Sequence, residues 1–329
     1  MMKFLMKFLR TALPTLLRLF CLAGAVAPAS AADYPNRPVR WLVGGAPGGP
    51  VDIVARIMGH WLSEHLGQQF VVENRTGSGG NLAAAAAINS APDGYTLLFV
   101  APNHAISASL YKKLPYDFIR DTVPVAGIMQ ITNMMVVPTS LPVNNVQEFI
   151  DYCKANPGKV SYASSGNGTS VHMSAELFKV MTKVDMVHVP YRGSAIAYPD
   201  LISDKVQTIF DNLPGALEQV RAGTLRGLGV TSPQRWPGLP EFPAIAETVP
   251  GFESVGFFGI SAPKGTPPEI IALLNKAVTE ALRDPKLAAR LAEVGGLPMP
   301  LTPGEFGKLI ADETEKWRKV VEFAGVSVD

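Results

Sequence analysis

Three glycine-rich segments contain the residue types that can do chemistry, and each stands directly before a predicted helix. They are Gly44–Asp52, Asn74–Asn81 and Ser164–Ser170. Glycine-rich backbone at a helix N-terminus points several N–H groups and the positive end of the helix dipole at one place, so an anion can bind there. We expect uncharged donors of this kind to hold a carboxylate. The candidate residues of the first two segments are Gly48, Gly49, Asp52, Ser78, Gly79 and Gly80.

Nucleotide binding fits the first segment poorly. Gly44 and Gly49 have the spacing of a phosphate-binding loop, but Pro50-Val51 stands where Lys and Ser or Thr are needed, and no G-x-G-x-x-G is present. Two alternatives stay open for this segment. First, its glycines can be needed only for a tight turn and not for binding an anion. Second, Asp52 can favour the first turn of its helix electrostatically, orient the loop or receive a ligand ammonium.

A serine hydrolase that uses Ser165 with His172 is the main enzymatic alternative, and Ser164 and Asp211 are also available to it. A nucleophile elbow needs G-x-S-x-G, which neither Ser78 nor Ser165 has. Metal chemistry is less expected, because the histidines are scattered and no H-E-x-x-H or cysteine pair occurs. We therefore expect a binding protein with no catalytic residue, no metal and no cofactor.

The elements that must position these segments alternate between short β-rich runs and helical patterns. The predicted strands are 39–43, 69–73, 95–100, 160–163, 186–189, 206–210, 225–230 and 257–262. The predicted helices include 53–66, 82–88, 170–181, 195–202, 214–222, 267–282, 285–294 and 303–323, with a further helix around Cys153. This alternation predicts an α/β fold with mostly parallel sheets flanked by helices. Loops after neighbouring parallel strands then lie at the same edge of a sheet, where such folds bind ligands.

Two proline-containing segments divide the predicted elements into two units. Pro138–Pro142 is predicted to cross from the first unit to the second, and Pro233–Pro250 to return. We expect lobe 1 to comprise 32–137 plus 251–329 and lobe 2 to comprise 138–250. Two lobes joined by two crossings form a cleft and allow hinge closure. One large open sheet is the alternative.

Residues 1–31 have the three parts of a secretory signal peptide: a basic start, a short apolar middle and an Ala29-Ser30-Ala31 end. We expect cleavage near Ala31/Ala32 and a monomeric periplasmic protein, with an amphipathic membrane anchor as the alternative. The whole chain has a formal charge of +1. Cleavage removes four cations and no acid, which leaves about −3 and argues against a nucleic-acid partner. Cys153 then remains as a single thiol, expected to be buried and inert.

The motifs of nearly the whole predicted mature chain, taken in order, resemble those of the extracytoplasmic receptors of tripartite tricarboxylate transporters, the Bug receptors. The matching segments of the first part are 34–39, Pro47-Gly48-Gly49 with Asp52 and 55–56, 66–68, 72–75, 77–81, 92–97 and 114–117. Those of the second part are 156–159, 162–164, Gly166, 168–169, His172, 188–193, 230–232, 250–253 and 262–267.

This resemblance implies a two-lobed periplasmic-binding-protein fold, type II-like, that closes as a Venus flytrap on a small organic carboxylate. It also implies delivery to a permease made of a large and a small membrane subunit. The loops at Gly48-Gly49 and Ser78-Gly79-Gly80 would hold the carboxylate end. The candidate ligand-binding residues of the other lobe are Ser164, Ser165, Thr169, His172, Tyr191, Gly193 and Asp211, while Arg192 fits a ligand contact or a surface position equally well.

One position departs from the family pattern. An aromatic residue usually stands two positions before the Pro-Gly-Gly, where this chain has Gly45. Loss of that ring predicts a wider pocket and makes a bulkier or aromatic acid plausible as the ligand. An orphan receptor that docks to a sensory membrane partner would use the same fold, so the sequence leaves transport and sensing open.

Overall fold

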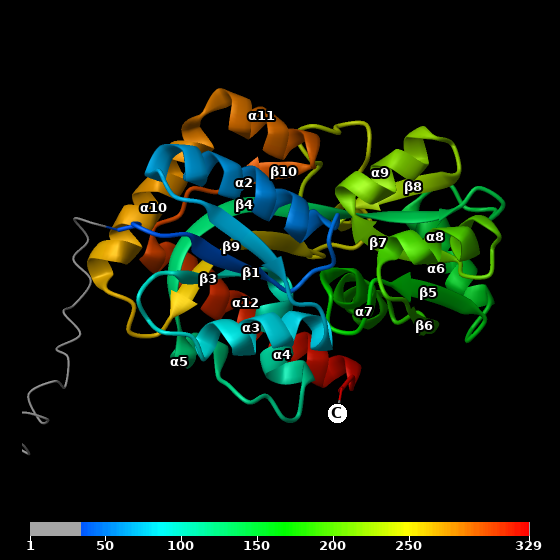
Figure 1. Cartoon of the computed structure of the whole chain (residues 1–329). Coiled ribbons are helices and arrows are strands. Elements are labelled where there is room, and N and C mark those ends of the chain that lie inside the picture. The colour runs from blue at the N-terminus through cyan, green and yellow to red at the C-terminus, as the bar shows by residue number, and fades with distance from the viewer. Residues whose placement is uncertain (1–33, 329) are drawn as a thin grey trace, which may run out of the picture. The chain divides into compact units, whose positions relative to one another are not determined.

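One long strand, β4 (Thr122–Pro138), belongs to two sheets and joins the two halves of the fold (Figure 1). The computed structural model describes residues 34–328, and the chain from Pro35 onward forms one compact unit. The first part of β4, up to Thr132, pairs with β9 (Val255–Pro263). The second part, from Asn133, pairs with β7 (Thr208–Asn212) and β8 (Leu225–Val230). We call the half that contains β9 the first lobe and the half that contains β7 the second lobe.

The first lobe has the strand order β2-β1-β3-β9-β4, with β10 also paired to β4. Its remaining strands are β1 (Val39–Val43), β2 (Phe70–Asn74), β3 (Thr96–Val100) and β10 (Gly296–Pro298). β1 pairs parallel with β2 and β3, whereas β9 runs antiparallel to both of its neighbours. Each parallel strand leads into a helix: α2 (Pro50–Leu66), α3 (Asn81–Ile88, after the 3-10 turn Ser78–Gly80) and α4 (Pro102–Leu110). The N-termini of these three helices therefore lie at one edge of the sheet.

The helices of the first lobe cover both faces of its sheet. Figure 1 shows α2, α10 (Pro268–Arg283) and α11 (Pro285–Glu293) on one face, and α3, α4 and α12 (Pro303–Ala324) on the other. A four-residue helix, α5 (Phe118–Asp121), precedes β4. The helix limits follow the sequence: Pro50 occupies the first turn of α2, and Gly67 ends it in the left-handed conformation that glycine adopts without strain.

The second lobe has the same strand–helix arrangement, with the strand order β4-β7-β5-β6. Its remaining strands are β5 (Val160–Ser164) and β6 (Met186–Pro190), and both β6 and β7 pair parallel with β5. Each of the three parallel strands leads into a helix: α7 (Ser170–Thr182), α8 (Ser194–Ile202) and α9 (Leu213–Arg221). α6 (Val146–Ala155), which carries the buried Cys153, and a 3-10 turn at Ile245–Glu247 complete this lobe.

Each lobe has a buried apolar core of its own. One cluster lies under α3, α4 and α12 and includes Phe257 and Phe306. In the second lobe, one cluster includes Phe149, Phe178 and Phe252, and another lies against α8 and α9. None of the described helices combines the length and the apolar character needed to cross a membrane.

The predicted α/β alternation is confirmed, but the sheets are mixed rather than mostly parallel. The reason is the way in which the chain passes between the lobes. It leaves on β4 and returns on β9, and these two central strands pair antiparallel. The partners of β4 change between Thr132 and Asn133, before the predicted crossing at Pro138–Pro142. The lobe boundaries at 137/138 and 250/251 stay predictions, and the predicted signal peptide, 1–31, lies outside the described residues.

Candidate ligand-binding site

Loops from the two lobes meet where the parallel strands end. We call Gly44–Gly49 the first loop, Gly77–Gly80 the second, Ser165–Thr169 the third and Tyr191–Gly193 the fourth. A Cβ atom placed on Gly79 would lie 3.4 Å from the main-chain oxygen of Asn167, so the second and third loops approach each other across the lobes. A Cβ on Gly168 would lie 2.6 Å from Leu110 Cδ2 at the end of α4. Larger residues at these two glycines would push the lobes apart.

The side chain of Asp52 stabilises the first loop through hydrogen bonds. Its side chain is buried and accepts hydrogen bonds from the Gly48 N–H at 2.9 Å, from Arg56 Nε at 3.0 Å and from Asn74 Nδ2 at 2.9 Å. Asn74 also donates to the Gly45 carbonyl at 3.0 Å. Burial by itself would raise the pKa of Asp52, but these hydrogen bonds and the Arg56 charge outweigh it and hold the pKa below its usual range. Asp52 therefore orients the loop, and its oxygens are already occupied by groups of the protein.

The amides of the glycines in the first loop are occupied as well. The Gly48 N–H donates to Asp52, and the Gly49 N–H donates to the Ala46 carbonyl at 3.1 Å. The N–H groups of Val51 and Asp52, in the first turn of α2, have no recorded partner in the described part of the chain. The glycines thus shape the loop, and the first-turn amides of α2 are the donors left for an anion.

The second loop packs closely on its neighbours. A Cβ on Gly44 would lie 2.7 Å from Gly80 Cα, so the first two loops touch through bare backbone. Asn103, near the start of α4, donates to the Gly79 carbonyl at 2.6 Å. Ser78 is exposed and has a positive φ of 47°. These contacts make glycine the residue that fits at Gly44 and Gly80.

A stack of aromatic rings supports the third loop. His188 Nε2 lies 2.6 Å from the buried Ser164 Oγ, and the ring of His188 stacks on that of His172 at 4.1 Å and on that of Tyr162 at 4.8 Å. His172 Nδ1 accepts the Gly168 N–H at 3.2 Å. Thr169 caps α7 by accepting the His172 N–H at 3.3 Å. The predicted residues Ser164, Thr169 and His172 therefore come together as supports of the loop.

Both histidines of this stack remain neutral at ordinary pH. Burial lowers the pKa of His172 to about 3, aided by the nearby His188 and Lys179. Burial also lowers the pKa of His188 to about 4, although Glu176 opposes the shift. Because His172 Nδ1 accepts a backbone N–H, the neutral ring carries its proton on Nε2.

The fourth loop is held by two carboxylates. Tyr191 donates its hydroxyl to Asp200 Oδ2 at 2.8 Å and its main-chain N–H to the Ser164 carbonyl at 2.9 Å. The fully buried Asp211 accepts hydrogen bonds from the Ser194 hydroxyl and the Tyr198 hydroxyl. Burial raises the pKa of Asp211 in spite of these bonds. Asp211 thus fixes the start of α8, directly after Gly193, and its oxygens point at protein hydroxyls.

Two glycines, one in the first loop and one in the fourth, are open on the side where a Cβ atom would stand. A Cβ on Gly48 or on Gly193 would meet nothing within 4 Å. Nearby cationic side chains are engaged elsewhere: Arg56 pairs with Asp52, and Arg75 lies 3.7 Å from Glu73. Arg192 is exposed. The donors that these loops leave for an anion are thus backbone N–H groups at helix starts, which suit a carboxylate better than a phosphate chain.

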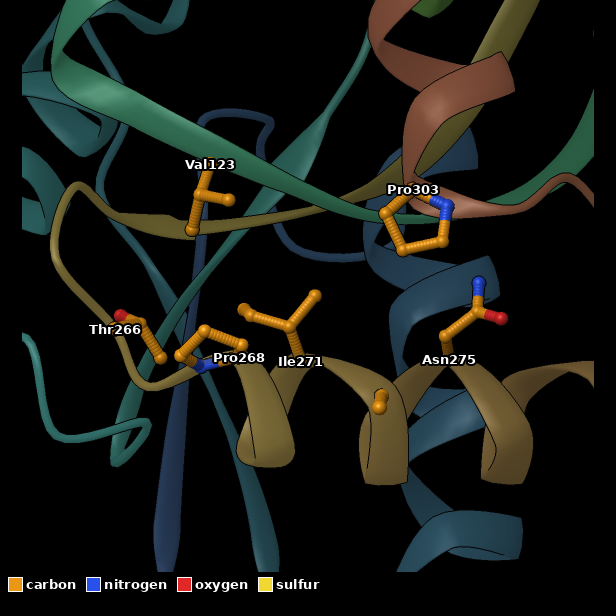
Figure 2. A pocket seen from close by; sticks show the side chains of 7 residues that line it. Val123, Thr266, Pro268, Ile271, Asn275 and Pro303 are labelled. Atoms are coloured by element: carbon orange, nitrogen blue, oxygen red, sulfur yellow. The ribbon is translucent and has the colours of Figure 1, made fainter.

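A separate pocket lies on other elements of the first lobe. Figure 2 shows its lining, which comes from the start of β4, the first turns of α10 and Pro303. Its one amide side chain, Asn275, already donates to the Val125 carbonyl at 2.9 Å and the Leu301 carbonyl at 3.0 Å. The lining is largely apolar, and its other polar side chain, Thr266, donates to the Pro263 carbonyl at 2.8 Å.

Comparison with known proteins agrees with this geometry. Residues 54–326 match the family described as the tripartite tricarboxylate transporter family receptor. The chain belongs to this receptor family. It is 37% identical to Protein BugT of Bordetella pertussis over 309 residues, which cover 93% of this chain and 95% of the relative.

Solved structures of similar proteins have the same fold as this receptor. The structure of R. palustris Rpa4515 with adipate is 38% identical and has a TM-score of 0.85, covering 90% of this chain and 99% of the other. The structure of MatC (Rpa3494) from Rhodopseudomonas palustris with bound malate is 32% identical and has a TM-score of 0.80, covering 88% of this chain and all of the other. The periplasmic binding protein BugD is 30% identical with a TM-score of 0.81, covering 89% and 99%. The predicted two-lobed periplasmic-binding-protein fold is thus confirmed.

In this receptor the side chain of Val51 occupies the space beside Gly45. A Cβ on Gly45 would lie only 2.1 Å from Val51 Cγ2. Val51 therefore occupies the position next to the glycine, and the wider pocket expected from the missing aromatic ring stays a prediction.

The residues of the hydrolase alternative do not form a catalytic pair. His172 Nδ1 accepts a backbone N–H, and within residues 34–328 no hydrogen bond joins Ser165 to His172. The same residues contain no cluster of three metal-binding side chains. Sequence reasoning missed three supports of the loops, Asn74, Asn103 and His188. Asn74 and His188 belong to the motifs of the resemblance, but their roles depend on contacts that only the fold creates.

Proposed function

We propose that this family member is a periplasmic receptor that binds a small organic carboxylate between its lobes and performs no bond chemistry. The observation that carries the proposal is the close approach of the second loop to the third, where a Cβ on Gly79 would lie 3.4 Å from the Asn167 main-chain oxygen, because each of these loops leads into a helix N-terminus of its own lobe. The adipate and malate bound by the two R. palustris proteins support the ligand class. A micromolar affinity corresponds to about −8 kcal/mol. A few hydrogen bonds to a charged carboxylate, at roughly 1.5–3 kcal/mol each, are enough to supply much of that free energy.

The loops of the first lobe would hold one carboxylate through the first-turn amides of α2 and the backbone of the second loop. Those of the second lobe would close on the rest of the ligand through the first turns of α7 and α8. Closure would bring together residues that neither lobe presents alone, which is how hinged two-lobed receptors gain affinity. In this arrangement Asp52, His172 and Asp211 position backbone donors.

Delivery to a large and a small membrane subunit of a tripartite tricarboxylate transporter completes the proposal, and the family match supports it. It requires export, which the pattern at 1–31 predicts. An orphan receptor of the same fold, docked to a sensory partner, remains the alternative. Genes for the two membrane subunits next to that of the receptor favour transport, and their absence favours the orphan role.

Calorimetric titration with adipate, malate and a wider carboxylate panel, after a thermal-shift screen, tests the binding function. Gly48→Asp places a fixed carboxylate over the first turn of α2, and we expect it to weaken binding by at least about 100-fold through like-charge repulsion and occupation of the donors. Gly48→Asn is the matched control, because it has nearly the same size and tolerates positive φ but carries no charge. Equal binding by the wild type and the two variants, or no carboxylate ligand at all, would remove the basis of the proposal.

The absence of bond chemistry is tested separately. A panel of ester substrates should give no turnover with the purified protein, and Ser165→Ala should leave that result unchanged. Turnover that disappears in Ser165→Ala would establish the hydrolase instead.

A further inference from the structure

A buried polar network lies where the chain crosses between the lobes. Asn133 is the first residue of β4 that belongs to the second lobe, and Thr231 lies beside it on the returning chain. The Thr231 N–H donates to the Asn133 carbonyl at 2.9 Å, and the Ser254 N–H donates to the Thr231 carbonyl at 2.9 Å. Asn133, Thr231 and Ser254 are all buried. Hydrogen bonds therefore connect the outgoing and returning chains at the point where they cross between the lobes.

The side chain of Asn133 extends this network to two helices of the second lobe. Its Oδ1 accepts a hydrogen bond from Asn212 Nδ2 at 2.7 Å, and Asn212 is the N-cap of α9. Its Nδ2 donates to Ser174 Oγ at 3.2 Å in the second turn of α7. Asn212 also donates to Ser170 Oγ, at the start of α7, at 3.3 Å. One amide thus connects the crossing to the N-termini of α7 and α9.

α7 packs in the cores of both lobes. Met173 is buried in the core under α3, α4 and α12, and Phe178 is buried in the core of the second lobe. Ser174, between them, shares a hydrogen bond with Ser254 on the returning chain at 2.7 Å. A change in the angle between the lobes must therefore shift α7 against one of its two cores, and the third loop is attached to the N-terminus of this helix.

We propose that Asn133 is a positioning residue that couples the lobe crossing to the N-termini of α7 and α9. The lobe angle and the geometry of the third loop then change together. A buried amide that engages both its oxygen and its nitrogen permits few arrangements, since any other one leaves a polar group unpaired. The consequence for affinity rests on the proposed carboxylate function, whereas the effect on lobe geometry does not.

The experiment compares Asn133→Ala with Thr132→Val. Thr132 is the neighbouring buried residue on β4, and its hydroxyl contacts Thr231 and the Asn133 carbonyl but neither helix. Spin labels on Lys205→Cys in the second lobe and Lys276→Cys in the first report the distance between the lobes without ligand. Both lysine side chains are more than 70% exposed. The labelled protein begins at Ala32 and so lacks Cys21, and burial keeps Cys153 unreactive by raising its pKa to about 12.

We expect Asn133→Ala to shift or broaden the distribution of distances between the labels, and Thr132→Val to leave it unchanged. In calorimetry with adipate, Asn133→Ala and Asn212→Ala should each weaken binding about fivefold to tenfold, and the double variant should bind no more weakly than either single variant. A distance distribution that stays the same in Asn133→Ala would overturn the proposal, even if the variant is less stable. If the wild type does not bind adipate, the distances still decide the coupling, and only the carboxylate function is called into question.

Discussion

The candidate loops of the two lobes are both rich in glycine but are supported by groups of different charge. In the first lobe an ionised carboxylate, Asp52, accepts the Gly48 N–H and fixes the loop. In the second lobe neutral histidines fix the loop. His172 accepts a hydrogen bond from the Gly168 N–H, and His188 forms a hydrogen bond with the Ser164 hydroxyl. The difference shows that loops of similar composition can be supported by different charges. It also predicts that the two loops fail under different conditions.

The largest effect is expected from removing the support of the first loop. Asp52→Ala leaves the Gly48 N–H without its acceptor and Asn74 Nδ2 with the Gly45 carbonyl alone, and each hydrogen bond lost in this way costs about 1–3 kcal/mol. We expect a fall of about 2–4 kcal/mol in the free energy of unfolding and a large loss of carboxylate affinity. Asp52→Asn, which keeps one oxygen acceptor, should lose less on both measures. Denaturant titration and calorimetry check this, and equal effects of the two variants would contradict the role of the acceptor.

Removing the support of the third loop should have a smaller effect. His188→Ala takes away the ring between Tyr162 and His172 and leaves the buried Ser164 hydroxyl with the Gly166 N–H alone as a partner. We expect a loss of about 1–3 kcal/mol in stability and about tenfold in ligand affinity. His188→Phe restores the ring but not the hydrogen bond, so it should recover part of the stability. No recovery would mean that the stack contributes nothing.

Acid should affect the support of the second lobe before that of the first. His172 and His188 have folded pKa values of about 3 and about 4, below the value of about 6.5 expected for unfolded histidine. The unfolded state therefore binds more protons below pH 6.5, and stability falls as the pH drops from about 6.5 towards 4. Asp52, whose pKa is lowered from 3.8, loses its contribution only below that value. Buried His104 in α4 has a pKa of about 4 and adds to the same fall.

Melting temperatures of the wild type, His188→Phe and His104→Asn between pH 7 and pH 4 separate these contributions. We expect a shallower loss of stability in each variant than in the wild type. If His188→Phe follows the wild-type curve, protonation of the second-lobe stack is not involved.

The smallest effect concerns the side chain that covers the first loop. Gly45→Ala would bring a Cβ to 2.1 Å from Val51 Cγ2, so one of them must move. We expect a loss of about 1 kcal/mol in stability, as for mild overpacking. Val51→Ala in the same chain should restore it. Failure of this rescue in denaturant titration would show that the strain at Gly45 comes from its backbone.

Much of the fold could be predicted from the sequence, because its strands and helices have regular patterns with clear ends. Gly67 and Pro303 mark helix limits that the structure reproduces. β4 was not among the predicted strands, and nothing in its sequence marks the change of partners at Asn133. α4 was missed because its first turn, Pro102-Asn103-His104, has the composition of a loop.

The sequence predicted where the loops before α2, α3 and α7 lie, but not which contacts their residues make. The glycines before α2, α3 and α7 indicate where an anion can bind. The patterns cannot show that the amides of Gly48 and Gly49 bond within the loop, or that Val51 covers Gly45, because these contacts depend on the exact path of the backbone. His188 is a similar case: it is distant in sequence from Ser164 and meets it only through the pairing of β5 with β6.

The most direct test of the central claim is a crystal structure of the protein grown with adipate, accompanied by native mass spectrometry of the protein as purified. The account predicts a ligand with a carboxylate between the lobes, in hydrogen-bond contact with the first-turn amides of α2 at Val51 and Asp52. A bound molecule without an anionic group, or a carboxylate that lies away from the helix N-termini, would contradict it.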